Sequence, residues 1–309
     1  MQAAGSAKRL YIYTAALIVT AIIIWFWEPT ALVYGIQRGS LYAVVALPLA
    51  LILGILGVLN LAHGEFLTVG LYATYTLFRN YGWDPMASAV PVSIILAVVG
   101  IGVYLLTVRQ VLKAGHLSQL LITFGIALVL SELLKSIYTT QPRAVFTTYS
   151  YAFTRFAGVR FGIYEFVYLA IALGVLFGLQ LFLKKTRLGQ ATFAVGQNPT
   201  GAAIVGINVR FVYLFVFGLS IAIVGLVSAF MVPRVSVFPG AGTPFTMKSF
   251  ALTAMAGLGN LNGILLAGLA LGILEAIVNA IPGGAGWSDV VVFGVLILVI
   301  LSRAFRGAR

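Results

Sequence analysis

Few residues of this sequence have side chains suited to chemistry, and those that do are scattered. The chain has no cysteine and only two histidines, His63 and His116. It contains no G-x-x-x-x-G-K-[ST] phosphate loop, no G-x-S-x-G nucleophile motif and no histidine pair at metal-binding spacing. The acidic residues of its apolar runs, Glu65, Glu132 and Glu275, are far apart in the sequence. We therefore expect no catalytic residue, no metal site and no cofactor in this chain.

One polar segment, NLAHGEF at residues 60–66, interrupts a long apolar stretch. Polar groups in a membrane span are costly, so they usually face the protein interior or a water-filled cavity. Gly64 breaks the helical pattern, and Glu65 then falls in the first turn of the next helix, where a carboxylate complements the helix dipole. The segment is therefore either a simple helix-end cap or a cavity wall at a broken helix, as found in transporters.

A second polar stretch, residues 184–208, lies between two apolar runs and contains QNPTGAAIVG. Asn198 is a good N-cap, Pro199 suits the first helical position, and Gly206 suits the end of a helix. We predict a short capped helix, Pro199–Val205, outside the membrane. Its small side chains would let another protein approach closely. It is either an ordinary interhelical loop or a docking helix that receives force from a cytoplasmic partner.

The composition indicates a membrane protein. Of the 309 residues, 61% are hydrophobic and 8% are charged, whereas soluble domains have about 25% charged residues. The apolar runs are near twenty residues long, the length of a membrane-spanning helix rather than of a barrel strand. We predict an all-α, polytopic transmembrane bundle of about 8–10 spans. Residues 1–309 form a single domain in this interpretation.

The runs can be placed in order along the chain. Leu10–Trp27 is a retained first span, because no small-residue cleavage site follows it. Ala31–Leu59 is the second, and Gly54 and Gly57 would permit close packing near its end. Phe245–Leu258 is too short for a comfortable crossing. A broken or re-entrant helix is therefore expected near residues 245–263.

Charge sets the predicted orientation. With the N-terminus in the cytoplasm and about ten crossings, the inner loops carry more lysine and arginine than the outer loops, as the positive-inside rule requires. Both termini and residues 184–208 are then cytoplasmic. Two breaks, residues 60–70 and 259–268, resemble each other slightly, which would fit two structural halves around a central path.

Three further patterns are weaker. Glu132 and Lys135 lie three residues apart and can pair on one helix face, although snorkelling at the outer end is favoured. Glu275 is either a buried polar tie or part of an interface. Gly259–Gly263 and Gly268–Gly272 have the GxxxG spacing of close helix contacts, which is common in any glycine-rich membrane chain.

Taken together, three segments resemble the permease of branched-chain amino acid-type ABC importers. They are GVLNLAHGEFLTVGLYATY (Gly57–Tyr75), TRLGQATFAVGQNPTGAAIVGINV (Thr186–Val209) and MKSFALTAMAGLGNLNGILLAGLALGILEA (Met247–Ala276). The resemblance covers nearly the whole chain in the right order. One departure is that such permeases commonly have an acidic residue before the Ala-Ala of the second segment, where this chain has Gln197 and Asn198. Docking would then depend more on shape than on charge.

The resemblance implies a multi-pass subunit of the bacterial cytoplasmic (inner) membrane with several partners. These are a second permease subunit, two cytoplasmic ATPases that bind ATP and Mg, and a periplasmic substrate-binding protein. Nucleic acid is not a partner. The implied ATPase-coupling residues are Gln197, Asn198, Pro199, Thr200, Gly201, Ala202, Ala203 and Gly206. The implied translocation-path residues are Asn60, His63, Gly64, Glu65, Thr68, Gly257, Gly259 and Asn260.

Four outer arginines complete the predicted site. Arg143, Arg155, Arg160 and Arg234 either meet acidic residues of the binding protein or are simply solvated. The cargo would be a small polar or zwitterionic solute, such as a branched-chain or other amino acid, an amide, urea or a small aromatic acid. The alternative function is a self-sufficient, ion-coupled secondary transporter or channel, which would need paired carboxylates within the membrane.

Overall fold

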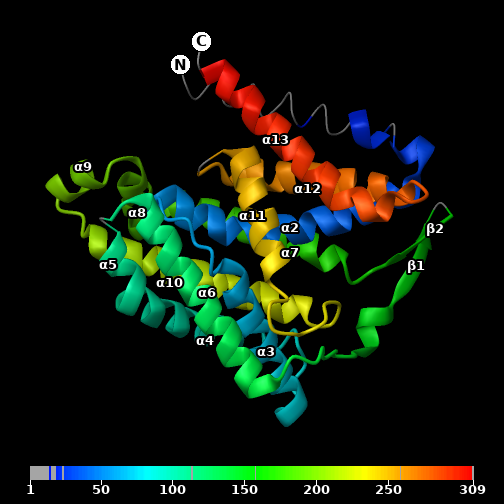
Figure 1. Cartoon of the computed structure of the whole chain (residues 1–309), viewed down its shortest axis with the longest axis horizontal. Helices are drawn as coiled ribbons and strands as arrows, with labels where there is room; N and C mark the ends of the chain where they lie inside the picture. Colours follow the sequence, from blue (N-terminus) through cyan, green and yellow to red (C-terminus); the bar gives the residue numbers. More distant parts are fainter. Residues whose placement is uncertain are drawn as a thin grey trace.

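The computed structural model describes residues 14, 19–22, 24–112, 114–156, 158–257 and 259–307. The predicted first span, Leu10–Trp27, lies largely outside the described residues. Figure 1 shows the described chain as a bundle of helices with one small hairpin. The predicted polytopic helical bundle is confirmed.

Six helices of the described residues are long and apolar enough to cross a membrane. They are α2 (Pro29–Leu56), the continuous helix Ala89–Val111, α6 (His116–Tyr138), α7 (Phe166–Lys185), α10 (Val209–Met231) and α12 (Leu261–Ala280). The second of these consists of α4 (Ala89–Val103), the π-helical turn η1 (Tyr104–Val108) and α5 (Arg109–Val111). Their largely apolar sequences explain why they form helices, because in hydrocarbon the backbone must satisfy its own hydrogen bonds.

Three other helices of the described residues are not among these six. They are α3 (His63–Tyr81), α11 (Thr243–Ala256) and α13 (Ser288–Gly307). Polar residues dilute the apolar character of α3, α11 has only 14 residues, and the apolar helical part near α13 is a short stretch, Gly284–Val299. These three segments therefore do not qualify as spans on length and composition, and the number of about 8–10 spans stays a prediction.

The loops hold more structure than expected. The segment between α6 and α7 contains the 3₁₀ turn η2 (Thr148–Tyr151) and an antiparallel hairpin of β1 (Phe153–Phe156) and β2 (Val159–Gly162). Residues 184–208 contain two helices rather than one, α8 (Arg187–Gln197) and α9 (Pro199–Ile204). A second 3₁₀ turn, η3 (Gly284–Trp287), precedes α13. In Figure 1, α9 and the hairpin lie at opposite ends of the molecule.

Helix α2 is the centre of the fold, and it is mostly buried. It packs most extensively against α12, while α10 packs against α4. The α2–α12 contact is a backbone contact between glycines: a Cβ on Gly39 would lie 2.5 Å from the Gly268 carbonyl oxygen, and one on Gly272 would collide with the backbone of Gly35 and Gly39. The predicted Gly268–Gly272 pattern therefore marks a real crossing, and Gly35 and Gly39 are its partner on α2.

The two glycines near the end of α2 have different roles. Gly54 makes the predicted close contact, because a Cβ there would lie 2.9 Å from Gly259 Cα. The prediction for Gly57 was wrong, since nothing lies within 4 Å of a Cβ at this position. Gly57 instead ends the helix in the left-handed region with φ 68°, where glycine is favoured.

Candidate functional site

The starts of α3 and α11 meet inside the bundle through a reciprocal pair of hydrogen bonds. The Gly64 N–H donates to Thr246 Oγ1 of the other helix at 2.8 Å, and the Gly242 N–H donates to Thr68 Oγ1 at 3.0 Å. A Cβ on either glycine would collide with the carbonyl of the other. Because the first N–H groups of a helix have no partner within it, each threonine satisfies a group that the other helix leaves free.

This junction joins two chain segments, each of three consecutive helices, that pack against each other in a symmetric pattern. Helices α2, α3 and α4 form one segment and α10, α11 and α12 the other. The first helix of each packs against the third of the other, and α3 contacts α11. The predicted likeness of residues 60–70 to 259–268 therefore had the wrong register. The structure matches residues 64–68, Gly-x-x-x-Thr, to residues 242–246, which have the same spacing.

His63 and Glu65 lie buried beside the junction. The His63 Nε2 is 2.8 Å from the Val45 carbonyl oxygen of α2. Pro48 lies within that helix, and its missing N–H disturbs the hydrogen bonds of this turn. The Glu65 Oε1 accepts a hydrogen bond of 3.0 Å from Thr243 Oγ1. The turn of α2 that contains Pro48 and the starts of α3 and α11 thus converge on one buried polar region.

Several buried polar atoms in this region have no partner within the described part of the protein. They are Asn60 Nδ2, His63 Nδ1 and Glu65 Oε2. The other polar atoms of these residues do have partners: Asn60 Oδ1, for example, accepts a bond from the Ala62 N–H at 3.1 Å. Buried polar groups are nearly always hydrogen-bonded to protein or water. This region is therefore suited to binding water or a polar solute.

The second predicted break lies elsewhere. Gly257, Gly259 and Asn260 follow the far end of α11, about 20 Å along this helix from the Gly242 junction. Both glycines have positive φ angles of 90° and 72°. Asn260 accepts a bond of 3.1 Å from the Gly263 N–H and so caps α12. The structure explains these residues by turn and cap geometry, and it does not bring them to the His63 group.

A buried cluster of charges between α2, α11 and α12 has no counterpart in the sequence predictions except Glu275. Its carboxylate accepts from Arg38 Nη1 at 2.8 Å, from Lys248 Nζ at 2.9 Å and from Tyr42 Oη at 2.8 Å. Lys248 also donates to Tyr42 Oη at 2.8 Å. Glu275 is thus the buried polar tie that was one of its two interpretations. The sequence did offer one signal for a partner of Glu275, because Arg38 is a single cation within an apolar run.

The predicted coupling helix has the expected caps. Asn198 Oδ1 accepts from the Gly201 N–H at 2.9 Å, Pro199 is the first helical residue, and Gly206 has a φ angle of 86°. The helix ends one residue early, at Ile204. Gln197 belongs to the end of α8. Of the predicted contact residues, Gly201 is half-buried, Ala202 is buried, and the others are exposed: Gln197, Asn198, Pro199, Thr200, Ala203 and Gly206.

Two apolar side chains extend this exposed surface. Ile204 is 82% exposed and Val205 is 75% exposed, on a helix at one end of the molecule. Helix α8 connects this surface to the core, because Gly196 packs against Ile55 near the end of α2. A force on α9 would therefore reach α2 through α8. The prediction had the small residues of α9 but missed Ile204 and Val205.

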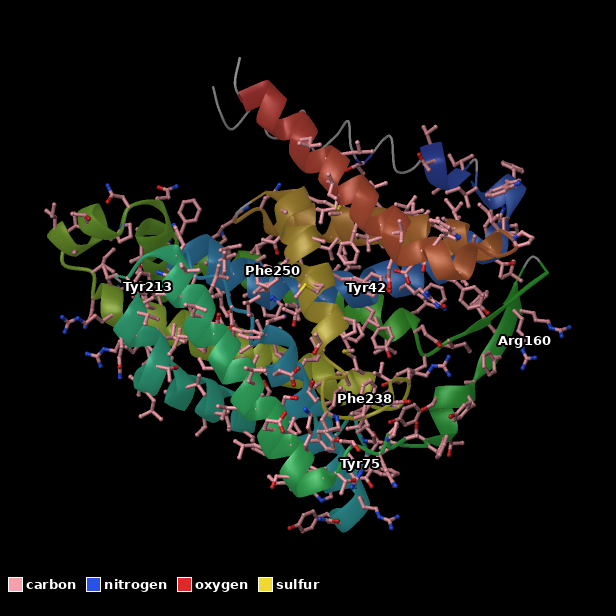
Figure 2. The ribbon with its side chains drawn as sticks, viewed as in Figure 1. Tyr42, Tyr75, Arg160, Tyr213, Phe238 and Phe250 are labelled. Carbon is pink, nitrogen blue, oxygen red and sulfur yellow. The ribbon has the colours of Figure 1, made fainter. Side chains whose placement is uncertain are left out.

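The four outer arginines differ in their contacts. Arg143 donates to the Tyr138 carbonyl and lies over the Tyr75 and Tyr138 rings. Arg234 pairs with Glu165. Arg155 and Arg160 face each other across the hairpin and are exposed, and Figure 2 shows Arg160 at the end of the molecule away from Tyr213. Arg155 and Arg160 are therefore the pair best placed to meet a partner.

The Glu132–Lys135 pair and His116 lie at the surface of the protein. Lys135 Nζ lies 2.7 Å from Glu132 Oε1, which confirms that these two residues can pair. Glu132 is 69% exposed, so this pair contributes little stability. His116 begins α6 and is exposed.

Comparisons with known proteins support one family. The family model described as "Branched-chain amino acid transport system / permease component" matches residues 31–301. The chain is 29% identical over 285 residues to the high-affinity branched-chain amino acid transport system permease protein BraD of Pseudomonas aeruginosa, covering 88% of this chain and 92% of BraD. It is 30% identical over 279 residues to the probable branched-chain amino acid transport permease protein LivH of Methanocaldococcus jannaschii, covering 87% of each. No solved structure matches.

Proposed function

The chain belongs to the family of branched-chain amino acid transport permease components, and from this premise we propose that its own cargo is a branched-chain or similar small amino acid. It is a permease subunit of an ABC importer and a multi-pass protein of the bacterial inner membrane, not an enzyme. The named relatives transport branched-chain amino acids. In the proposal the whole chain forms one permease domain, and residues 184–208 are its coupling segment.

The proposed path passes the junction of α3 and α11. Asn60, His63 and Glu65 offer polar atoms there that no described protein group satisfies. Small residues and the two helix starts leave the positive ends of both helix dipoles facing the same region, which favours the carboxylate of a zwitterion. Gly257, Gly259 and Asn260 act at the other end of α11, as the re-entrant turn between α11 and α12.

The family implies ATPase and substrate-binding partners in general. We place two ATPases, with their ATP and Mg, against α9 on the cytoplasmic side. The binding protein then contacts the hairpin at the opposite end, where Arg155 and Arg160 are exposed. Both termini are cytoplasmic in this orientation. A second permease subunit, identical or related, completes the path.

The observation that carries the coupling proposal is the exposed apolar end of α9, with Ile204 82% exposed and Val205 75% exposed. At a cytoplasmic end these side chains meet water unless a partner covers them. Small neighbours such as Ala203 allow that partner to approach closely.

The test is Ala203→Glu in the complete transporter in proteoliposomes. A glutamate on this exposed position leaves the fold intact but places a large charge in an apolar contact. We expect leucine uptake to fall about tenfold or more while ATP hydrolysis continues, because a buried unpaired charge costs several kcal/mol. Ala203→Ser is the matched control and should retain uptake. Full uptake by Ala203→Glu would refute docking at α9.

The same vesicles separate an importer from an ion-driven carrier. An ion-coupled transporter would need paired carboxylates, but Glu275 is bound by Arg38 and Lys248, and Glu132 is bound by Lys135. Of the three carboxylates within apolar runs, Glu65 is the one with a buried oxygen that no described protein group satisfies. Collapse of the proton gradient with ATP present should leave uptake unchanged. Loss of uptake would instead favour a secondary transporter with Glu65 as its coupling residue.

A further inference from the structure

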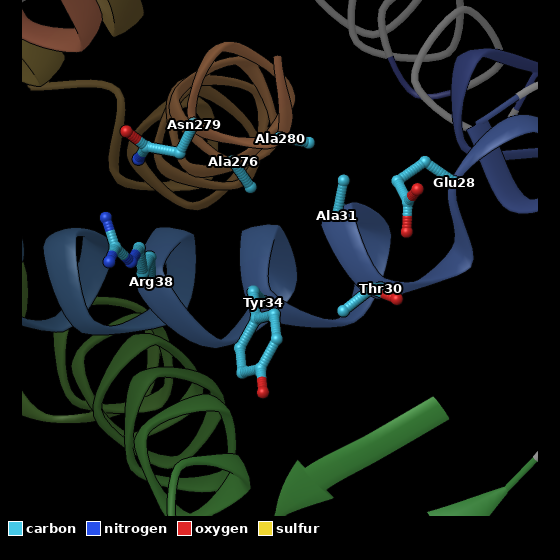
Figure 3. A pocket seen from close by; sticks show the side chains of 8 residues that line it. All are labelled: Glu28, Thr30, Ala31, Tyr34, Arg38, Ala276, Asn279 and Ala280. Atoms are coloured by element: carbon cyan, nitrogen blue, oxygen red, sulfur yellow. The ribbon is translucent and has the colours of Figure 1, made fainter. Parts of the chain in front are cut away.

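A cavity of about 400 Å³ lies between the first half of α2 and the end of α12, within the size range of ligand pockets. Figure 3 shows Arg38 of α2 and Asn279 of α12 toward one end of it and Glu28 toward the other. Ala31, Ala276 and Ala280 provide an apolar wall. The cavity therefore combines a cation, an amide and small apolar side chains.

Arg38 is an unusual residue at this place. It lies nine residues after Pro29, the first residue of α2, or about 14 Å along the helix. Its side chain is nevertheless 50% exposed on the surface of this chain. A cation inside a membrane span almost always faces a water-filled cavity or another protein group, because exposure to lipid is costly. The exposed guanidinium thus requires a polar environment at the α2–α12 cavity.

The charges around Glu275 leave a cation in excess. Its one carboxylate binds both Lys248 and Arg38. Lys248 is 13% exposed and Glu275 is 6% exposed, so these two groups form the buried pair. Asp289 is 3.7 Å from Lys248 but 70% exposed, and solvent weakens this contact. The unbalanced positive charge therefore lies at Arg38, the member of the cluster that faces the cavity.

The Arg38 guanidinium also has N–H donors that are not used in the Glu275 contact. Arginine has five N–H donors in a rigid fork that matches a carboxylate. In the described part of the chain the structure gives a hydrogen-bond partner only for Nη1. Glu275, held in turn by Lys248 and Tyr42, fixes the orientation of that fork. Binding of a second carboxylate by the remaining donors would need little reorganisation.

We propose that Arg38 binds the carboxylate of the transported solute at the α2–α12 cavity, with Glu275 as the residue that positions its guanidinium. This inference rests on the proposed function and adds a residue-level site outside the α3–α11 junction. The apolar wall suits an aliphatic side chain. Glu28 is ten residues before Arg38, about 15 Å along the helix, and is therefore too far away to neutralise it.

The chain has no cysteine, so Arg38→Cys places a single thiol in the cavity. The complete transporter is reconstituted in proteoliposomes, and wild-type leucine uptake is measured first. We expect Arg38→Cys to lower uptake about tenfold or more, as loss of a charge-assisted hydrogen bond predicts. Aminoethyl methanethiosulfonate, which adds a cation, should restore part of this uptake. Sulfonatoethyl methanethiosulfonate, which adds an anion, should not.

Protection from labelling tests binding without transport. L-leucine should slow modification of the thiol at position 38, whereas L-leucinamide, which lacks the carboxylate, should not. Arg38→Lys keeps the charge and should retain more uptake than Arg38→Cys. Ser136→Cys, on the exposed face of α6, should transport normally with either reagent. Size-exclusion chromatography establishes that each variant is assembled.

Four results would overturn the role of Arg38. Uptake by Arg38→Cys could respond equally to both reagents, or leucine could leave the labelling rate unchanged. The thiol could also be inaccessible in the assembled transporter, which would place Arg38 against a carboxylate of the second subunit instead. A labelling rate set by anionic lipid content would assign it to lipid headgroups. Failure of wild-type leucine uptake counts against the proposed cargo, whereas normal wild-type uptake with any of these results rejects Arg38 alone.

Discussion

The helix pairs α2–α12 and α4–α10 occupy matching places in the two halves of the fold, yet they are built differently. In α2–α12, glycines of both helices meet backbone to backbone, and Arg38 and Glu275 pair across the contact. In α4–α10, glycines of one helix face apolar side chains of the other: a Cβ on Gly100 would lie 2.7 Å from Ile221 Cβ, and one on Gly225 would lie 2.9 Å from both Leu96 Cβ and the Val92 carbonyl oxygen. The described residues of α4–α10 form no ion pair with each other, and their polar contact is Ser93 Oγ donating to the Ala222 carbonyl at 2.7 Å.

This difference indicates that close packing of two helices in this fold does not require buried charge. Small residues already bring helices together in membranes, and α4–α10 does so with one hydroxyl bond. An ion cluster in the interior often stabilises no more than apolar residues of similar volume. The charges of α2–α12 are therefore better explained by a function, which is why we assign Arg38 to the solute.

The largest effect should come from Gly272→Leu. The new side chain would overlap the α2 backbone at Gly35 and Gly39, which cannot move aside as a side chain can. Overpacking of a core commonly costs about 1–3 kcal/mol and occasionally more. Here the cost should exceed that range, because the new side chain meets backbone atoms and would separate the central helix pair. We expect loss of monodisperse protein in detergent. Gly174→Leu is the control, because nothing lies within 4 Å of a Cβ at Gly174. A normal yield and melting temperature for Gly272→Leu would show that the α2–α12 contact is looser than the structure indicates.

Glu275→Gln should have the next largest effect. It leaves Lys248 buried without its anion, and removal of one partner from a buried pair costs about 3–5 kcal/mol. We expect the low end of this range for Glu275→Gln, because Arg38, the second cation that loses its partner, is half exposed and stays solvated. Thermal unfolding in detergent measures the loss. Glu132→Gln removes the same charge from an exposed pair and should cost less than about 1 kcal/mol. Equal effects of the two substitutions would mean that the Glu275 cluster is solvated.

Local signals in the sequence predicted much of this structure. The span Val209–Met231 has the predicted bounds, and Asn198, Pro199 and Gly206 predicted the caps of α9 because a cap depends on neighbours in sequence. The other helix of that loop, α8, was not predicted. Its N-cap, Thr186, was a usable signal, because the Thr186 hydroxyl accepts a hydrogen bond from the Gly189 N–H.

Contacts between distant residues were not predictable in the same way. Arg38 and Glu275 are 237 positions apart, and no spacing rule connects residues on separate helices. The meeting of Gly64 with Gly242 depends likewise on how α3 and α11 enter the bundle. The sequence did identify Asn60, His63 and Glu65 as candidate functional residues, because polar residues in an apolar run are costly wherever the helices pack.

Ser93→Ala should have the smallest effect and complete the comparison. It removes the hydrogen bond that the hydroxyl donates to the Ala222 carbonyl. This carbonyl belongs to α10 and keeps its backbone hydrogen bond within that helix. A hydrogen bond between membrane helices contributes about 0.6 kcal/mol on average, so we expect a small decrease in thermal stability. Leucine uptake should be unchanged, because the packing of α4–α10 rests on its glycines. Ser136→Ala, on the exposed face of α6, is the control and should have no effect on either measurement. If Ser93→Ala lowered stability as much as Glu275→Gln, polar contacts would hold both helix pairs, and the charge of α2–α12 would no longer require a role in binding.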